Sequence, residues 1–210
     1  MKRLLLTSAM IATTVSLAHA APIITFGSTS SGNNVTATAS GATTTITSSV
    51  STDITQIISG PAAPFTATLT LDATSTNAAM AVGSQILQDY TGTFSLTNGA
   101  TNYLSGTFTD ALFGSGTGLT LTASSATPGE TVSFTSNVIP AADLAAPQAI
   151  SFAFSNVSPA ASIADGTLAS FTAHLSGTAS AGSPAPVPEP ASLSLIGTGL
   201  LGLGAVAHRR

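Results

Sequence analysis

The chain is 210 residues long; 43% of its residues are hydrophobic and only 6% are charged, with four Lys or Arg against eight Asp or Glu. All four basic residues lie outside the central part of the sequence, at Lys2, Arg3, Arg209 and Arg210. A surface without cations repels phosphate groups, which excludes nucleic acid as a partner of that central part. The absence of cysteine excludes disulfides, thiolate metal sites and a cysteine nucleophile.

Residues 1–20 have the three parts of a secretory signal peptide. Met1-Lys2-Arg3 is the basic start, Leu4 to Leu17 is the apolar run, and Ala18-His19-Ala20 is a cleavage site with Ala18 and Ala20 as its small residues. The apolar run is shorter than a permanent membrane span needs. The pattern predicts cleavage after Ala20 and a mature chain that begins at Ala21.

Residues 21–181 form the predicted folded domain, which is rich in Ser and Thr. In the segment Phe65 to Asp72, every odd position is apolar and every even position is polar. Strict alternation is typical of an antiparallel strand with one face on a core and the other in solvent. The same pattern recurs at residues 93–97, 104–110, 119–123, 132–135, 150–156 and 171–176. We therefore expect an all-β fold with a single antiparallel β-sandwich, jelly-roll or Ig-like.

The remaining segments of this domain alternate less clearly. Residues 27–59 are so rich in Ser and Thr that they predict edge strands or a loop, and residues 77–87 and 141–146 predict a turn or two of helix. Most of the nine Phe residues occupy apolar positions of the alternating pattern, so we expect them in the core. Phe152 and Phe154 are two such predicted core residues.

Residues 182–190 are Pro-rich and predict an extended linker that ends in Pro188-Glu189-Pro190. Residues 191–210 predict one transmembrane helix with a basic tail. The apolar run from Ala191 to Ala207 would span roughly 26 Å as a helix, close to the ~30 Å of a bilayer core. Arg209 and Arg210 would stop transfer and stay in the cytoplasm under the positive-inside rule.

The motif Val187-Pro188-Glu189-Pro190-Ala191-Ser192, the Leu- and Gly-rich stretch 193–204 and the arginine pair occur in this order. Together they resemble the PEP-CTERM sorting signal of Gram-negative bacteria. Tails of this kind are sometimes also classified as the C-terminal domain of ice-binding proteins. The resemblance implies processing near the Pro-Glu-Pro triplet by an exosortase, a membrane-embedded cysteine transpeptidase. It also implies transient anchoring in the inner membrane, final location at the cell surface or in the extracellular matrix, and association with exopolysaccharide and biofilm.

From these features we expect a non-enzymatic, exported surface or matrix protein with no catalytic residues, no metal and no cofactor. Its expected partners are the exosortase, extracellular polysaccharide and, before processing, the membrane. Two alternatives remain on the same β scaffold. A glycan-active enzyme would need two carboxylates facing one cleft, such as Asp89 and Asp110. An ice-binding protein would need its Thr-x-Thr steps to form a flat, regular face.

The remaining chemistry-bearing residues have structural explanations. His174 alternates with Thr172 and Ser176, which predicts that all three face solvent instead of forming a catalytic triad. No calcium-loop pattern occurs among the acidic residues. Asp72, Asp89, Asp110 and Asp165 are expected at strand ends, where turns favour Asp.

Overall fold

The computed structural model describes residues 20–182 of the chain, without the side chains of Asp110 and Ala111. Three predicted parts lie almost entirely outside the described residues. They are the linker after Gly182 with the motif residues Val187 to Ser192, the transmembrane helix with Arg209 and Arg210, and the signal peptide before Ala20, including Ala18. Among the described residues, no helix has the length and apolar character that a membrane crossing requires.

Residues 20–182 form thirteen strands and one short 3₁₀ helix. These elements are β1 (Ala21–Ser28), β2 (Val35–Ser40), β3 (Thr43–Ile57), β4 (Phe65–Ser75), β5 (Met80–Val82), β6 (Gln85–Asn98), β7 (Thr101–Ser115), β8 (Gly118–Ser124), β9 (Thr131–Thr135), η1 (Ala141–Leu144), β10 (Ala149–Ser158), β11 (Ile163–Ala164), β12 (Thr167–Leu168) and β13 (Phe171–Ala181).

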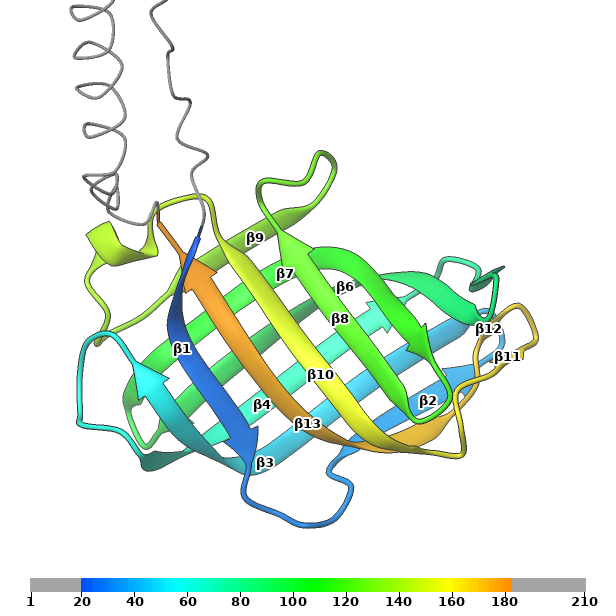
Figure 1. The fold of residues 1–210 in the computed structure, drawn as a ribbon, viewed down its shortest axis with the longest axis horizontal. Helices are drawn as coiled ribbons and strands as arrows, with labels where there is room; N and C mark the ends of the chain where they lie inside the picture. The colour runs from blue at the N-terminus through cyan, green and yellow to red at the C-terminus, as the bar shows by residue number, and fades with distance from the viewer. Residues whose placement is uncertain (1–19, 183–210) are drawn as a thin grey trace, which may run out of the picture. The chain divides into compact units, whose positions relative to one another are not determined.

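Eleven of these strands form one antiparallel sheet that closes on itself. The neighbours follow the chain in the order β3-β4-β6-β7-β8-β10-β13, and β1 closes the circuit because it pairs with both β13 and β3. In Figure 1, β1, β13, β10 and β8 cross in front of β3, β4 and β6. The predicted all-β antiparallel class is confirmed. The predicted sandwich, jelly-roll or Ig-like, is wrong, because hydrogen bonds continue all round and leave no break between two sheets.

The strands β1 and β2 both lie between β3 and β13, one at each end of the closed sheet. β1 pairs with the last residues of β3 and β13, whereas β2 pairs with the first residues of both. The prediction of edge strands or a loop for residues 27–59 is therefore wrong, since β3 has neighbours along both of its sides. Alternation failed there because Thr44, Ser48 and Thr52 occupy inward positions and are buried, which removes the polar–apolar contrast.

The helix predicted for residues 77–87 is also wrong. This segment contains β5 and the start of β6, joined through Gly83, whose φ of 65° suits a tight hairpin turn. The predicted helical turn at residues 141–146 is confirmed in part by η1.

The core fills the inside of the closed sheet. Seven of the nine Phe residues are buried, and the ring of Phe152 lies among those of Phe26, Phe94 and Phe108, with centroid distances of 6.1, 5.5 and 5.8 Å. The described residues form a compact unit of their own, which contains every strand pairing among them. We call residues 21–182 the β domain, and because they contain the complete closed sheet and its core, we expect them to fold alone.

Inward-facing glycines make room for these rings. Phe94 and Phe134 both lie opposite Gly106, and Phe26 and Phe152 both lie opposite Gly177. A side chain at either glycine would meet a Phe ring atom at less than 3 Å. Glycine at such positions lets a sheet bend sharply, and the facing ring covers the exposed backbone.

The closed sheet has two distinct ends. At the first, the terminal end, Ala21 pairs with Ala181. At the second, the hairpin end, lie β5, the turn between β7 and β8, and the separate β11–β12 hairpin. Figure 1 shows β11 and β12 on the side away from the first residues of β1.

Candidate functional site

The outer face of the sheet carries rows of hydroxyl groups that run from strand to strand, which we call the hydroxyl rows. Each row takes one residue from β2, β3, β4, β6, β7 and β9, and consecutive members are register partners. The first row is Thr38, Thr45, Thr74, Thr91, Thr109 and Thr131; the second is Thr36, Thr47, Asp72, Thr93, Thr107 and Ser133. The two rows are two residues apart along every strand, so the hydroxyls form a two-dimensional array.

Strand geometry sets the spacing of this array. Neighbouring members of a row are separated by about 4.8 Å and the rows by about 6.7 Å. Some hydroxyls bond to each other, as Thr107 does to Ser133 at 2.7 Å and Thr109 to Thr131 at 3.1 Å. The other members are exposed or half-buried and keep hydrogen-bonding capacity for solvent or a ligand.

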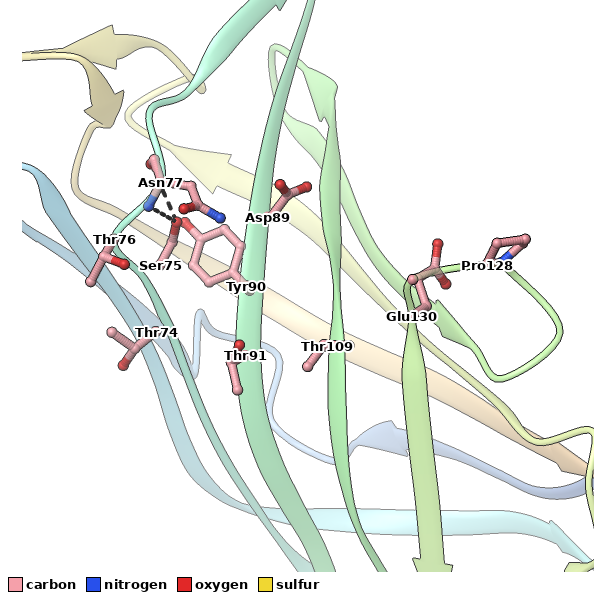
Figure 2. A pocket seen from close by; sticks show the side chains of 11 residues that line it. Thr74, Ser75, Thr76, Asn77, Asp89, Tyr90, Thr91, Thr109, Pro128 and Glu130 are labelled. Atoms are coloured by element: carbon pink, nitrogen blue, oxygen red, sulfur yellow. Dashed lines mark hydrogen bonds between the residues drawn. The ribbon is translucent and has the colours of Figure 1, made fainter.

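A hollow of about 380 Å³ opens on this face, toward the hairpin end. Threonines of the first row line it together with the carboxylates of Asp89 and Glu130, and we call it the acidic hollow. Figure 2 shows Asp89 on β6 and Glu130 beside Pro128, with the strand that carries Thr109 between them. Glu130 accepts a hydrogen bond from the backbone N–H of Ser124 at 2.8 Å, which fixes its position.

Beneath the hollow, Gln88 joins three parts of the chain. Its amide nitrogen donates to the carbonyl oxygen of Asn77 at 2.7 Å and to Oγ1 of Thr167 at 2.8 Å. Its amide oxygen accepts from the hydroxyl of Tyr90 at 3.2 Å and from the backbone N–H of Leu168 at 3.1 Å. All four hydrogen-bonding positions of the amide are therefore used, and they hold β12 across the hairpin end.

Tyr90 is buried at the hairpin end, and burial changes the pKa of its phenol. Burial raises the pKa of its phenol well above the usual value, because the phenolate would lose hydration. A hydrogen bond with the Thr44 side chain acts in the opposite direction but is the smaller effect. The phenol is therefore neutral under physiological conditions and serves as a hydrogen-bond donor within the cluster.

The structure puts His174 on the outer side of β13, between buried Ala173 and buried Leu175. Its Nε2 lies 3.0 Å from the carbonyl oxygen of Ser30. The prediction that His174 faces outward is thus confirmed.

Asp165 directly follows β11, so its predicted placement at a strand end is confirmed, whereas Asp110 lies inside β7 and the same prediction is wrong for it. Asp72 and Asp89 lie inside β4 and β6, so their predicted placement at strand ends is wrong too. Each occupies an outward position, where a carboxylate stays hydrated without a turn.

The carboxylate pair considered for an enzyme is not a cross-strand pair. Asp89 is in register with Ala111, and Asp110 is in register with Tyr90. Among the described side chains, no three or more His, Asp or Glu residues are grouped closely enough to hold a metal ion.

The register of the hydroxyl rows could not be seen in the sequence. The Thr-x-Thr steps are irregularly spaced along the chain because loops of different lengths separate the strands. Pairing removes this irregularity: Thr45, Thr74 and Thr91 become direct neighbours. The signal that could have found the rows is the shared outward phase of these residues, combined with a correct strand order.

Comparison with known proteins identifies the sorting signal. The family model of the PEP-CTERM protein-sorting motif matches residues 186–210. The chain is thus a PEP-CTERM motif-containing protein, which marks it for export toward the cell envelope and for sorting by an exosortase. No curated protein and no solved structure matches the chain.

Proposed function

We propose that this exported protein is a non-enzymatic component of the cell surface or extracellular matrix that binds exopolysaccharide through its hydroxyl rows. The observation that carries the proposal is the in-register array of Thr and Ser, interrupted by Asp72, on the outer face of β2, β3, β4, β6, β7 and β9. Hydroxyls both donate and accept, as sugar hydroxyls do, so the two can replace each other's water. Many weak contacts along one polymer chain add up through multivalency.

The charge of the β domain limits the class of polysaccharide that it can bind. Residues 21–182 contain seven carboxylates and neither Lys nor Arg. Polyanions such as alginate would be repelled from this surface at low salt, whereas a neutral polysaccharide would not. The proposed ligand is therefore a neutral exopolysaccharide of the biofilm matrix.

The non-enzymatic part of the proposal rests on the acidic residues. Glycoside hydrolysis requires two carboxyl groups that flank one scissile bond. The register puts Asp110 opposite Tyr90 and not opposite Asp89, and Glu130 accepts a hydrogen bond from the backbone of Ser124. The acidic hollow is left with Asp89 as its unbonded carboxylate among those described, which supports binding in preference to acid–base catalysis.

Co-sedimentation of the β domain, residues 21–182, with cellulose, insoluble dextran and an alginate gel tests the proposal. We expect retention on a neutral polymer, and a loss of retention when Thr74, Thr91 and Thr109 are all replaced by Val. The matched control replaces Thr120, Thr122 and Thr178, which lie outside the rows, by Val. Equal loss in both triple variants, or release of reducing sugars by the wild type, would contradict the proposal.

The regular array also bears on the ice-binding alternative. Regular spacing favours it, but the array belongs to a sheet that closes on itself, and neighbouring strands in sheets rotate by about 20–25°. A row across six such strands is curved and does not match a flat crystal plane. A thermal hysteresis measurement on the β domain separates the two functions, and we expect none.

A further inference from the structure

One row of side chains on the outer face is apolar, unlike the hydroxyl rows. Met80, Leu87 and Phe113 are consecutive register partners on β5, β6 and β7, at the hairpin end of the sheet. Met80 is 57% exposed, Phe113 is 45% exposed, and Leu87 between them is half-buried. Exposed apolar side chains that form one contiguous group mark a site of interaction. We call these three residues the apolar row.

Hydrogen-bonding side chains lie on both sides of the apolar row. Asp89 follows Leu87 by two residues on β6, is exposed, and lines the acidic hollow (Figure 2). Gln85 precedes Leu87 by two residues and is half-buried. Side chains two residues apart share a face of a strand, so both point outward like Leu87. Val82 lies opposite Gln85 and, at 55% exposed, adds one apolar side chain beside Met80.

Strand geometry sets the dimensions of this surface. Neighbouring strands are about 4.8 Å apart, so the apolar row is about 10 Å long from β5 to β7. Residues two apart along a strand are separated by about 6.7 Å, which is the spacing from Leu87 to Asp89 on one side and to Gln85 on the other. The surface is therefore an apolar strip with a hydrogen-bonding side chain on each of its long borders.

A pyranose sugar distributes its chemistry in the same way. The faces of its ring carry C–H groups, which pack on apolar side chains and on the electron-rich face of an aromatic ring. Among the described side chains, Phe113 is the one aromatic residue that is exposed instead of buried or half-buried. The hydroxyls project from the ring edge, where they can donate to the carboxylate of Asp89 and exchange hydrogen bonds with the amide of Gln85.

Charge and chain shape distinguish between possible occupants of the apolar row. Residues 21–182 contain no Lys or Arg, so a second copy of the β domain would bring further carboxylates toward Asp89. A neutral polysaccharide brings no such repulsion. Its successive ring faces lie in one line only where the chain is extended and flat and its hydroxyls are equatorial, whereas a coiled chain turns its ring faces in different directions.

We propose that the apolar row is a stacking subsite for a neutral polysaccharide with extended, flat chains and equatorial hydroxyls, of the kind that cellulose represents. The ring faces pack on Met80, Leu87 and Phe113, and hydroxyls at the ring edges bind Asp89 and Gln85. This inference rests on the proposed function, and it assigns the class of polysaccharide and the residues that select it. A chain on the apolar row lies parallel to the hydroxyl rows, which then contact neighbouring chains of the same polymer.

The probes are cellulose and insoluble dextran, a neutral polymer of coiled chains, each co-sedimented with the β domain. We expect tighter retention on cellulose than on dextran. Phe113→Ser should weaken retention on cellulose about tenfold, through the loss of one aromatic stacking contact, and should affect retention on dextran much less. Met80→Ser tests the same row from a different strand, and circular dichroism melts verify that each variant is folded. The control is Ile58→Ser, because Ile58 is 44% exposed but follows β3 at the terminal end.

The outcomes separate this subsite from the function on which it rests. Absence of wild-type retention on both polymers would refute the proposed function, and the subsite with it. Retention that is lost in the triple Val variant of the hydroxyl rows but unchanged in Phe113→Ser and Met80→Ser would refute the subsite alone. Equal retention on cellulose and dextran, with equal loss in Phe113→Ser, would refute the preference for flat chains. Concentration-dependent dimerisation that Phe113→Ser abolishes would assign the apolar row to a second copy and overturn the inference.

Discussion

The ring of Phe94 occupies the space in which a side chain of Gly106 would lie. The two residues are opposite each other on β6 and β7, and a Cβ placed on Gly106 would be 2.7 Å from Cε1 of Phe94. It would also lie 2.5 Å from the carbonyl oxygen of Ser133 on β9. Ring and backbone therefore both exclude any larger residue, and Gly106 is fixed by packing on two sides.

Gly106→Ala should consequently destabilise the β domain. Overpacking of this kind costs about 1–3 kcal/mol, measured as the change in unfolding free energy in urea melts. Gly27→Ala is the control, because a Cβ there would meet its nearest neighbour, Cβ of Ser176, at 3.9 Å. That variant should stay within about 0.5 kcal/mol of wild type. Equal effects at both positions would mean that ring packing is not the cause.

Phe152→Ala tests the core itself. The Phe152 side chain is fully buried among three other rings, so truncation removes apolar contacts and leaves a cavity. We expect a loss of about 3–5 kcal/mol in unfolding free energy. Thr68→Ala, on the exposed side of β4, should change it by less than about 0.5 kcal/mol. Comparable losses would show that the assignment of inner and outer faces is mistaken.

Gln88→Ala tests whether the four hydrogen bonds of the Gln88 side chain hold β12 at the hairpin end. The change leaves the Tyr90 hydroxyl and the Leu168 N–H without their acceptor, and each buried unsatisfied group costs about 1–3 kcal/mol. Amide hydrogen exchange should accelerate first in β11 and β12. Gln56→Ala, an exposed position on β3, provides the control. Unchanged hydrogen-exchange rates in β11 and β12 would contradict this role of Gln88.

The raised pKa of Tyr90 predicts that the β domain loses stability in alkaline solution. Its folded-state pKa is raised, so above about pH 10 the unfolded chain loses the phenolic proton before the folded chain does. Stability that is complete below this pH therefore falls as the pH rises further. Urea melts at pH 9, 10 and 11 should show the decline in wild type. The decline should be smaller in Tyr90→Phe, and an equal slope in both would exclude Tyr90 as its source.

The sorting motif predicts an effect that is independent of the fold. Replacing Glu189 or Pro190 should leave export intact but block the final processing step, because neither residue belongs to the apolar segments that direct membrane insertion. Mass spectrometry of the C-terminus of the exported protein measures this directly. An unchanged C-terminus in the variants would show that the triplet is not part of the processing signal.

The strands could be predicted from the sequence wherever core and solvent faces differ in polarity. β4 and β10 alternate cleanly, and Phe152 and Phe154 are buried as expected. β3 could not be predicted, because Thr44 and Thr52 are polar on the buried side. A β-branched Thr is accepted there when its hydroxyl finds a partner, as that of Thr44 does at Leu168.

Alternation also says nothing about which strands are neighbours. A period of two residues assigns a side chain to a face, but pairing depends on turns and on contacts distant in sequence. The closure of β1 against β13 and the register of Thr74 with Thr91 both depend on such contacts. The sequence therefore predicted the class of the fold and the hydroxyl-rich surface, but not the closed sheet or the array.

The pairing of Ala21 with Ala181 has a consequence for the order of events during secretion. β1 can pair early with β3, but its second partner, β13, is the last strand to be delivered, so the closed sheet cannot form on a partly translocated chain. Contacts this distant along the chain also form slowly. In a chain that crosses the membrane unfolded, the closed sheet is therefore completed only after β13 has followed β1 to the far side.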